Sequence, residues 1–140
     1  MYKKKIIIAV LVILVFVVTL NTFIFVVSSN REGVISFSGT GNDMLSINYE
    51  NGFSINAQHI NGSHCMHVNF NTSNLNNLHV HNANTGGQMF FELTQGDIVR
   101  RTNITGNFNG NIDTSTFESG RVTMRVIYER AEGINFSVSW

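Results

Sequence analysis

The chain ends in two alternating stretches that decide its fold class, GRVTMRVIY at 120–128 and GINFSVSW at 133–140. Successive side chains of a β-strand point to opposite faces, so apolar residues at every second position predict a strand with one buried face. The residues that follow this period are Val122, Met124, Val126, Tyr128, Ile134, Phe136, Val138 and Trp140. Between the two stretches, residues 129–133 are predicted to form a hairpin loop.

The same alternation recurs through residues 30–140, where helical spacing of apolar residues is absent. Glycine- and asparagine-rich turns separate the alternating segments, and 107–111 is predicted to be a loop. About nine short strands predict an all-β domain, an antiparallel β-sandwich of jelly-roll type, with no helix outside the N-terminal segment. Besides the last two, strands are expected at 34–38, 44–49, 53–60, 64–70, 78–82, 88–93 and 97–104.

The phase of the alternation also predicts the core. One hairpin is predicted to its register: a three-residue loop at 50–52 pairs Tyr49 with Phe53 and Ile47 with Ile55, which puts the apolar side chains of both strands on one face. A two-residue turn at 51–52 would instead place Ile47 opposite Asn56. The side chains expected to be buried are Met66, Val68, Phe70, Val122, Met124, Val126, Phe136 and Val138.

Three lysines, Lys3, Lys4 and Lys5, precede an almost unbroken apolar run at 6–27. As a helix this run would extend about 33 Å, enough to cross a hydrocarbon core of roughly 30 Å. The run is longer than the apolar part of a cleaved signal peptide, about 7 to 15 residues, so we favour an uncleaved single-pass anchor over a signal peptide. Because lysines prefer the cytoplasmic side, the rest of the chain is expected outside.

The predicted organisation is therefore a membrane anchor or signal segment at 1–29, followed by an extracytoplasmic β-sandwich domain at 30–140. The expected location is the cell membrane, or the medium if the N-terminal segment is cleaved. After residue 30, six arginines oppose nine carboxylates, a net charge of 6 − 9 = −3. An acidic domain lacks the positive surface that binding to nucleic acid requires. We expect the membrane as a partner through residues 6–27, no nucleic acid, and an unidentified protein or glycan ligand.

Four short motifs follow one another in the exported part: GTGND at 39–43, NGF at 51–53, HING at 59–62 and MHVNF at 66–70. Together with the two closing strands, this order resembles small exported prokaryotic β-sandwich domains, in which a Gly-x-Gly-Asp-like loop precedes a hairpin, a His-x-x-Gly turn and a strand. The sequence departs from that pattern in its last strand, where Phe136 takes the place of the usual aromatic residue and Trp140 stands at the very end. The resemblance implies a β-sandwich fold and no assigned activity.

All five histidines lie within residues 59–81, together with the only cysteine, Cys65. The alternation that turns Met66 inward turns His67 outward, and the same argument turns His79 and His81 outward on the next strand. If the two strands are neighbours, His67, His79 and His81 share an exposed face that suits Zn²⁺ or Cu²⁺, to which Cys65 can add a thiolate. The alternative is that they are ordinary outward residues of a half-exposed sheet. We expect exposure without a closed metal site.

The sequence holds no Gly-x-Ser-x-Gly, His-Glu-x-x-His or phosphate-binding glycine motif. We therefore expect no enzyme and no bound cofactor. The predicted function is a membrane-anchored extracytoplasmic domain with a binding or structural role. The alternative function is an exported histidine-based metal-binding domain, and a hydrolase comes third.

Overall fold

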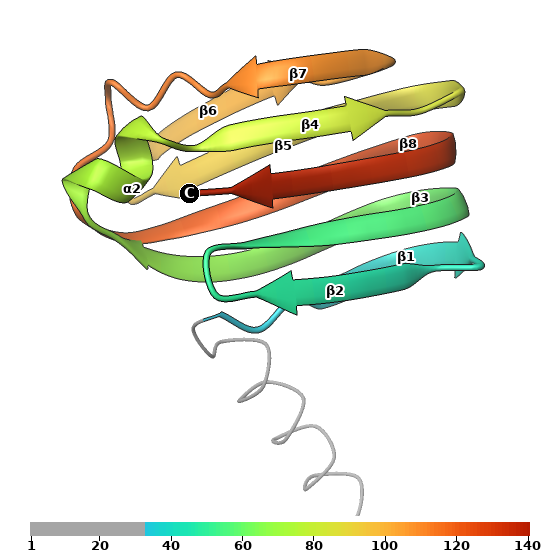
Figure 1. Ribbon diagram of the computed structural model, residues 1–140, viewed down its shortest axis with the longest axis horizontal. Coiled ribbons are helices and arrows are strands. Elements are labelled where there is room, and N and C mark those ends of the chain that lie inside the picture. The colour runs from blue at the N-terminus through green and yellow to red at the C-terminus, as the bar shows by residue number, and fades with distance from the viewer. Residues whose placement is uncertain (1–32) are drawn as a thin grey trace, which may run out of the picture.

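The computed structural model describes residues 33–140, and these form an all-β, antiparallel domain as predicted (Figure 1). The N-terminal anchor or signal segment, with Lys3 to Lys5 and the apolar run, lies outside the described residues. Within residues 33–140, no helix has the length and hydropathy needed to cross a membrane. The described elements are β1 (Ser36–Asn42), β2 (Leu45–Tyr49), β3 (Gly52–Phe70), α2 (Thr72–Asn76), β4 (His79–Ala83), β5 (Gly86–Gln95), β6 (Ile98–Asn103), β7 (Asn107–Asn111) and β8 (Gly120–Ser139).

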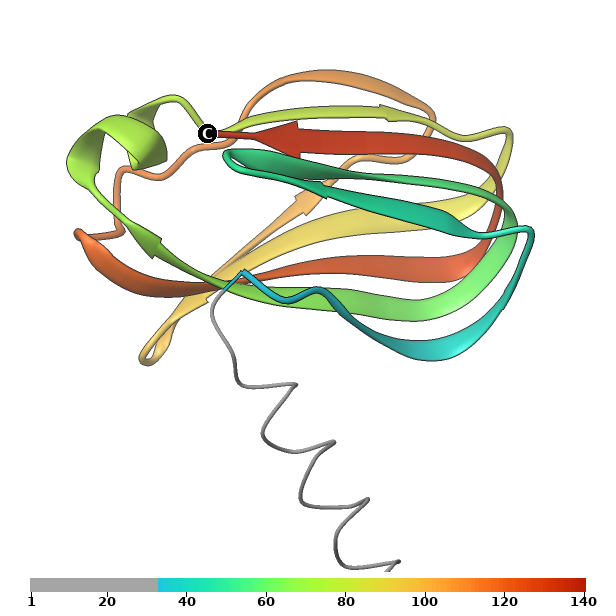
Figure 2. The same cartoon turned by 60° about the horizontal axis from the view of Figure 1, so that its bottom comes forward.

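Two long strands make the sheet fold over on itself (Figure 2). Residues 52–57 of β3 pair with 134–139 of β8 in one layer, and residues 62–70 of β3 pair with 120–128 of β8 in the other. Layer I has the order β2, β3, β8, β4, β7, and layer II has the order β1, β3, β8, β5, β6. Both long strands pass from one layer to the other at the same end of the molecule.

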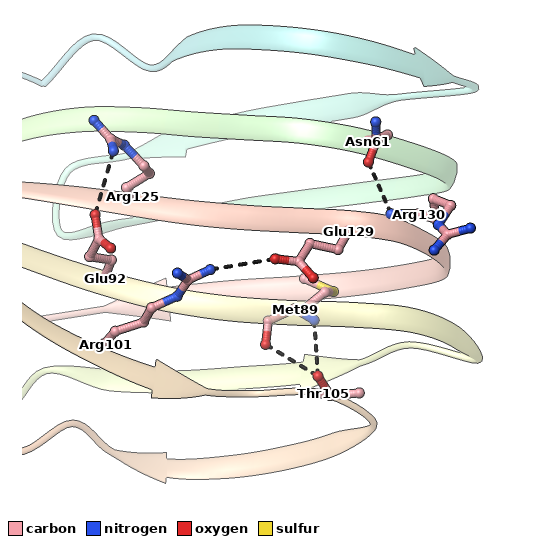
Figure 3. Close-up of polar contacts among 8 residues, drawn as sticks. All are labelled: Asn61, Met89, Glu92, Arg101, Thr105, Arg125, Glu129 and Arg130. Carbon is pink, nitrogen blue, oxygen red and sulfur yellow. Dashed lines mark hydrogen bonds and ion pairs between the residues drawn. The ribbon is translucent and has the colours of Figure 1, made fainter.

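The predicted hairpin loop at 129–133 is wrong, because these residues are the bend of β8. Residues 120–128 and 134–139 pair with β3 rather than with each other. Arg130 takes a positive φ of 51° at the bend, and its backbone N–H donates to Asn61 Oδ1 at 3.1 Å (Figure 3). Asn61 lies at the register shift of β3, between Ile60 and Gly62, so the two long strands bend side by side. The strands predicted at 53–60 and 64–70 are likewise one bent strand.

The hydrophobic core lies between the two layers, and its inward residues are those that the alternation predicts. The Phe136 ring packs against Phe53 and Phe91, with centroids 5.7 and 6.3 Å away, so one aromatic cluster joins β3, β5 and β8. His64 and Asn82 are the polar side chains that the core encloses most completely. The predicted core is confirmed for Met66, Val68, Phe70, Val122, Met124, Val126, Phe136 and Val138, all of which are buried.

The predicted register of the β2–β3 hairpin is wrong by one residue. Tyr49 pairs with Gly52, not Phe53, and Ile47 pairs with Ser54, not Ile55. A Cβ atom at residue 52 would overlap the Val138 carbonyl oxygen of the neighbouring β8, so glycine occupies that paired position. The slip turns the apolar side chains of β2 to the outer surface, because the side-chain period of a strand is two.

Two further elements differ from the sequence prediction. Residues 107–111 form the strand β7, which pairs with β4 and is not a loop. Asparagine is a poor indicator of strands, and only Phe108 of this segment packs against the core, so the alternation is weak there. The short helix α2 was also not predicted: Asn71 Oδ1 accepts a hydrogen bond from Asn74 N at 2.8 Å, and Leu75 is buried.

Candidate binding face

The outer face of layer I is a grid of side chains without carboxylates, arginine or lysine. The strand registers place three rows across five strands, and these rows are Tyr49–Gly52–Ser139–His79–Asn111, Ile47–Ser54–Ser137–His81–Asn109 and Leu45–Asn56–Asn135–Ala83–Asn107. We call this surface the amide face, because asparagine is its most frequent residue. None of these positions holds an acidic residue, an arginine or a lysine.

The outer face of layer II is charged, in contrast to the amide face. Arg125 Nη1 lies 3.5 Å from Glu92 Oε1, and Arg101 Nη2 lies 3.7 Å from Glu129 Oε1 (Figure 3). The Arg101 guanidinium also lies 4.2 Å from the centre of the Phe90 ring. The difference in charge between the two faces comes from which residues point outward on each layer. The overall amino-acid composition of the chain does not determine it.

His79 organises the β4–β7 edge of the amide face. Its Nδ1 lies 2.9 Å from Asn111 Oδ1 and its Nε2 lies 2.8 Å from Asn109 Oδ1. These hydrogen bonds, that to Asn111 first, raise the pKa of His79, because amide oxygens favour the ring that carries a proton on both nitrogens. The imidazole thus holds two asparagines of the neighbouring strand in defined positions.

The three histidines of the predicted metal site do not come together. His79 and His81 lie on the amide face, whereas His67 lies on the outer face of layer II. β3, which holds His67, pairs with β1, β2 and β8, whereas β4 pairs with β7 and β8. The condition for a shared site, that the two strands are neighbours, is therefore not met. His81 is exposed, and His67 and His79 are half-buried. Within residues 33–140, no three His, Cys, Asp or Glu side chains are grouped as metal ligands.

Three further titratable side chains, His64, Cys65 and His67, lie close together in the sequence of β3 but have different surroundings. His67 Nδ1 lies 2.9 Å from Thr123 Oγ1, and partial burial together with the nearby charge of Arg121 lowers the pKa of His67. The half-buried Cys65 is a free thiol on the same outer face. His64 points into the core, where its Nδ1 lies 3.1 Å from the Tyr128 hydroxyl.

Two clefts lie at opposite ends of the molecule. A cleft of about 330 Å³ at the bends of β3 and β8 includes His59, Arg130 and Glu132, and His59 Nδ1 lies 3.8 Å from Glu132 Oε1. Both side chains are exposed, and the separation exceeds a hydrogen bond, so this is a surface ion pair when His59 is protonated. A cleft of about 290 Å³ at the other end includes Asn48, Asn74 and Trp140.

The sequence matches no known protein-family model and no curated protein. Sequence reasoning missed the amide face because it assigned 107–111 to a loop. The signal was present in the segment itself, since Asn107, Asn109 and Asn111 alternate with Phe108 and Gly110 at the period of a strand.

Proposed function

We propose that the protein is a membrane-anchored, extracytoplasmic binding domain whose amide face recognises a neutral, hydroxyl-rich ligand, namely a glycan. The observation that carries this proposal is the grid on the outer face of layer I, which lacks carboxylates, arginine and lysine, opposite an outer face on layer II that bears ion pairs. The role we propose is binding, because amide and hydroxyl groups predominate among the polar side chains of the grid and these groups form hydrogen bonds to a ligand.

The proposal includes a finer description of the fold, a jelly-roll β-sandwich. Counting each half of β3 and β8 as a separate strand, layer I has the inner order β3, β8, β4, β7 and layer II has β3, β8, β5, β6. This interleaved order is typical of a jelly roll, and β1 and β2 add one edge strand to each layer. Lectin domains use the same architecture.

The ligand class follows from the chemistry of the grid. Amide and hydroxyl groups donate and accept hydrogen bonds, so they match sugar hydroxyls without requiring a counter-charge. Neighbouring strands lie about 4.8 Å apart and alternate residues of a strand about 6.7 Å apart, which gives a regular array of polar groups on a rigid support. The grid has no carboxylate, arginine or lysine to pair with a charged ligand, and His79 at its β4–β7 edge is the position where protonation would add a positive charge.

The proposal is tested with the full-length protein in lipid nanodiscs and a panel of soluble polysaccharides: a neutral glucan, galactan and mannan, with heparin as the polyanion. We expect at least one neutral polysaccharide to bind, with an affinity insensitive to added salt. Isothermal titration calorimetry at low and high salt measures the binding and the salt dependence of its affinity. Preferential binding of heparin, or binding that salt abolishes, would contradict the proposal.

A pair of matched variants locates the binding surface. Asn135→Asp places a carboxylate on β8, the central strand of the amide face, and Asn103→Asp makes the same change on β6 of layer II; both residues are exposed. We expect Asn135→Asp to weaken binding about tenfold, because a hydrogen-bond donor is lost at the contact. Asn103→Asp leaves the affinity unchanged. The reverse pattern would place the ligand on layer II.

The metal-binding alternative requires His67 beside His79 and His81. The pairing of β4 with β8 and β7 puts His67 on the opposite layer, so the geometry favours the amide face over a shared metal site.

A further inference from the structure

An apolar stripe lies on the edge strand β2, where it forms the outermost column of the amide face. Leu45, Ile47 and Tyr49 point outward from β2 with relative exposures of 57%, 40% and 54%. We call these three residues the β2 stripe. Of the seven large hydrophobic residues that are exposed in residues 33–140, five lie between Val34 and Tyr49. Clustering of this kind marks an interaction surface, whereas single exposed apolar residues do not.

The chain enters the domain beside this stripe. Gly33 N donates to His67 O at 2.9 Å, and Asn48 Nδ2 donates to Gly33 O at 2.6 Å. Asn48 lies between Ile47 and Tyr49 in β2 and pairs with the buried Phe53. Gly33 is therefore held at the inner side of the edge strand whose outer side bears the stripe. Residues 28–32 separate Gly33 from the apolar run at 6–27, and five residues extend at most about 18 Å.

We propose that the β2 stripe lies against the outer surface of the lipid bilayer, at the boundary between headgroups and acyl chains. This inference rests on the membrane anchoring proposed above. The short connection keeps the β1–β2 edge close to the bilayer, and an apolar stripe held there is removed from water by contact with lipid. Tyr49 suits this position because tyrosine places an apolar ring and a polar hydroxyl at the membrane interface.

The contact sets the orientation of the whole domain. Because strand side chains stand roughly perpendicular to their sheet, the stripe meets lipid when the outer face of layer I tilts toward the bilayer at its β2 edge. β7 lies four strand spacings away along layer I, about 19 Å, and is the strand of this layer furthest from the bilayer. The amide face then runs away from the membrane rather than parallel to it, which leaves its β4–β7 edge open to ligands from outside the cell.

Charges around the stripe indicate the kind of lipid. Asp43 and Glu50 flank the two ends of β2, and both are exposed. Carboxylates at these positions gain nothing from an anionic surface. The contact is therefore apolar, and a zwitterionic phosphatidylcholine bilayer is sufficient for it.

The test uses full-length protein in phosphatidylcholine vesicles that contain a fraction of brominated phosphatidylcholine as a quencher. In a Cys65→Ser background, Ile47→Cys carries a fluorescent label on the β2 stripe. The matched control is Val99→Cys on β6, an exposed apolar residue (58%) on an edge strand at the far side of layer II. We expect the label at residue 47 to be quenched several-fold more strongly than the label at residue 99.

Equal quenching at the two positions would overturn the orientation. So would self-quenching between labels at residue 47 without quenching by lipid, because that result means that the open edge of β2 pairs with a second copy. Flotation of the vesicles separates this failure from that of the anchoring. Protein that floats with vesicles while residue 47 stays unquenched contradicts only the orientation, whereas protein that does not float contradicts both.

Discussion

At the scale of single residues, His64 is a titratable group inside an apolar core. Its ring lies 4.7 Å from the Phe37 ring and 5.5 Å from the Tyr128 ring, centroid to centroid. Burial lowers the pKa of His64 from 6.5 to about 4, since the charged imidazolium is poorly solvated there. Burial also raises the pKa of Tyr128 well above its usual value, so this pair is neutral near pH 7.

Stability should therefore fall as the pH falls from about 6.5 to about 4. In this range the unfolded chain protonates His64 and the folded protein does not, so protons bind preferentially to the unfolded state. Over this pH range, His64 alone should lower the free energy of unfolding by about 3 kcal/mol. Urea titrations of the full-length protein in detergent, followed by the fluorescence of the single Trp140, measure the free energy of unfolding at each pH.

His64→Leu is the control for this prediction. Its free energy of unfolding should change much less between pH 6.5 and 4 than that of the native protein, because the titrating group is gone. His67 and His79 titrate in both proteins, so their contributions cancel in the comparison. Parallel pH profiles for the two proteins would show that His64 is not the group responsible.

At the scale of elements, β1 and β3 approach each other at a pair of glycines. Gly39 pairs with Gly62, and both have positive φ angles, 142° and 146°. A Cβ atom on Gly39 would overlap the Asn61 carbonyl oxygen, and a Cβ atom on Gly62 would overlap the Ser38 carbonyl oxygen. The pairing of β1 with the bent part of β3 thus depends on two glycines, which have no side chain to overlap the opposite backbone.

Gly39→Ala is expected to lower the free energy of unfolding by about 2 kcal/mol or more, because the methyl group meets backbone and the φ angle is unfavourable. Gly41→Ala, two residues further along β1, is the matched control. Its Cβ would lie 3.4 Å from the His59 carbonyl oxygen, so we expect a change within about 0.5 kcal/mol. Thermal unfolding compares the two variants, and similar melting temperatures would contradict the close approach at residue 39.

The packing of one layer on the other depends on the aromatic side chains of the inner faces. Phe136→Ala or Phe70→Ala should cost about 3–5 kcal/mol, because each removes a buried ring and leaves a cavity. Phe90→Ala is the control: this ring lies on the outer face of layer II under Arg101, and its loss should cost about 1 kcal/mol or less. Denaturant unfolding measures all three. An unchanged stability of Phe136→Ala would place that ring outside the core.

At the scale of the whole molecule, the proposed membrane topology of the protein places the β domain outside the cell. Protease added to intact cells should remove the chain after Arg31, while the segment with Lys3 to Lys5 stays protected. Immunoblotting of the C-terminal fragment measures the cleavage, and a cytoplasmic marker that survives the treatment shows that the cells are intact. A domain that resists protease in intact cells but not after lysis would lie on the cytoplasmic side.

The sequence by itself determined the fold class and the inward residues. The period-two alternation around Met66, Val122 and Phe136 requires one face of each strand to be buried, whichever strands pair. It also determined that His67 and His81 point away from the core. Whether a side chain points inward or outward depends on its position in the alternation along its own strand, and this can be read from the sequence alone.

Tertiary structure alone decided which strands pair, where the long strands bend and how β2 aligns with β3. The separation of His67 from His79 depends on β8 lying between their strands, and no local pattern encodes that contact. β2 pairs its Tyr49 with Gly52, a position where a Cβ atom would overlap the Val138 carbonyl oxygen of β8. The amide face, the bend at Arg130 and the exposed β2 stripe are all products of contacts between residues far apart in the sequence, and this is why the alternation of single strands does not predict them.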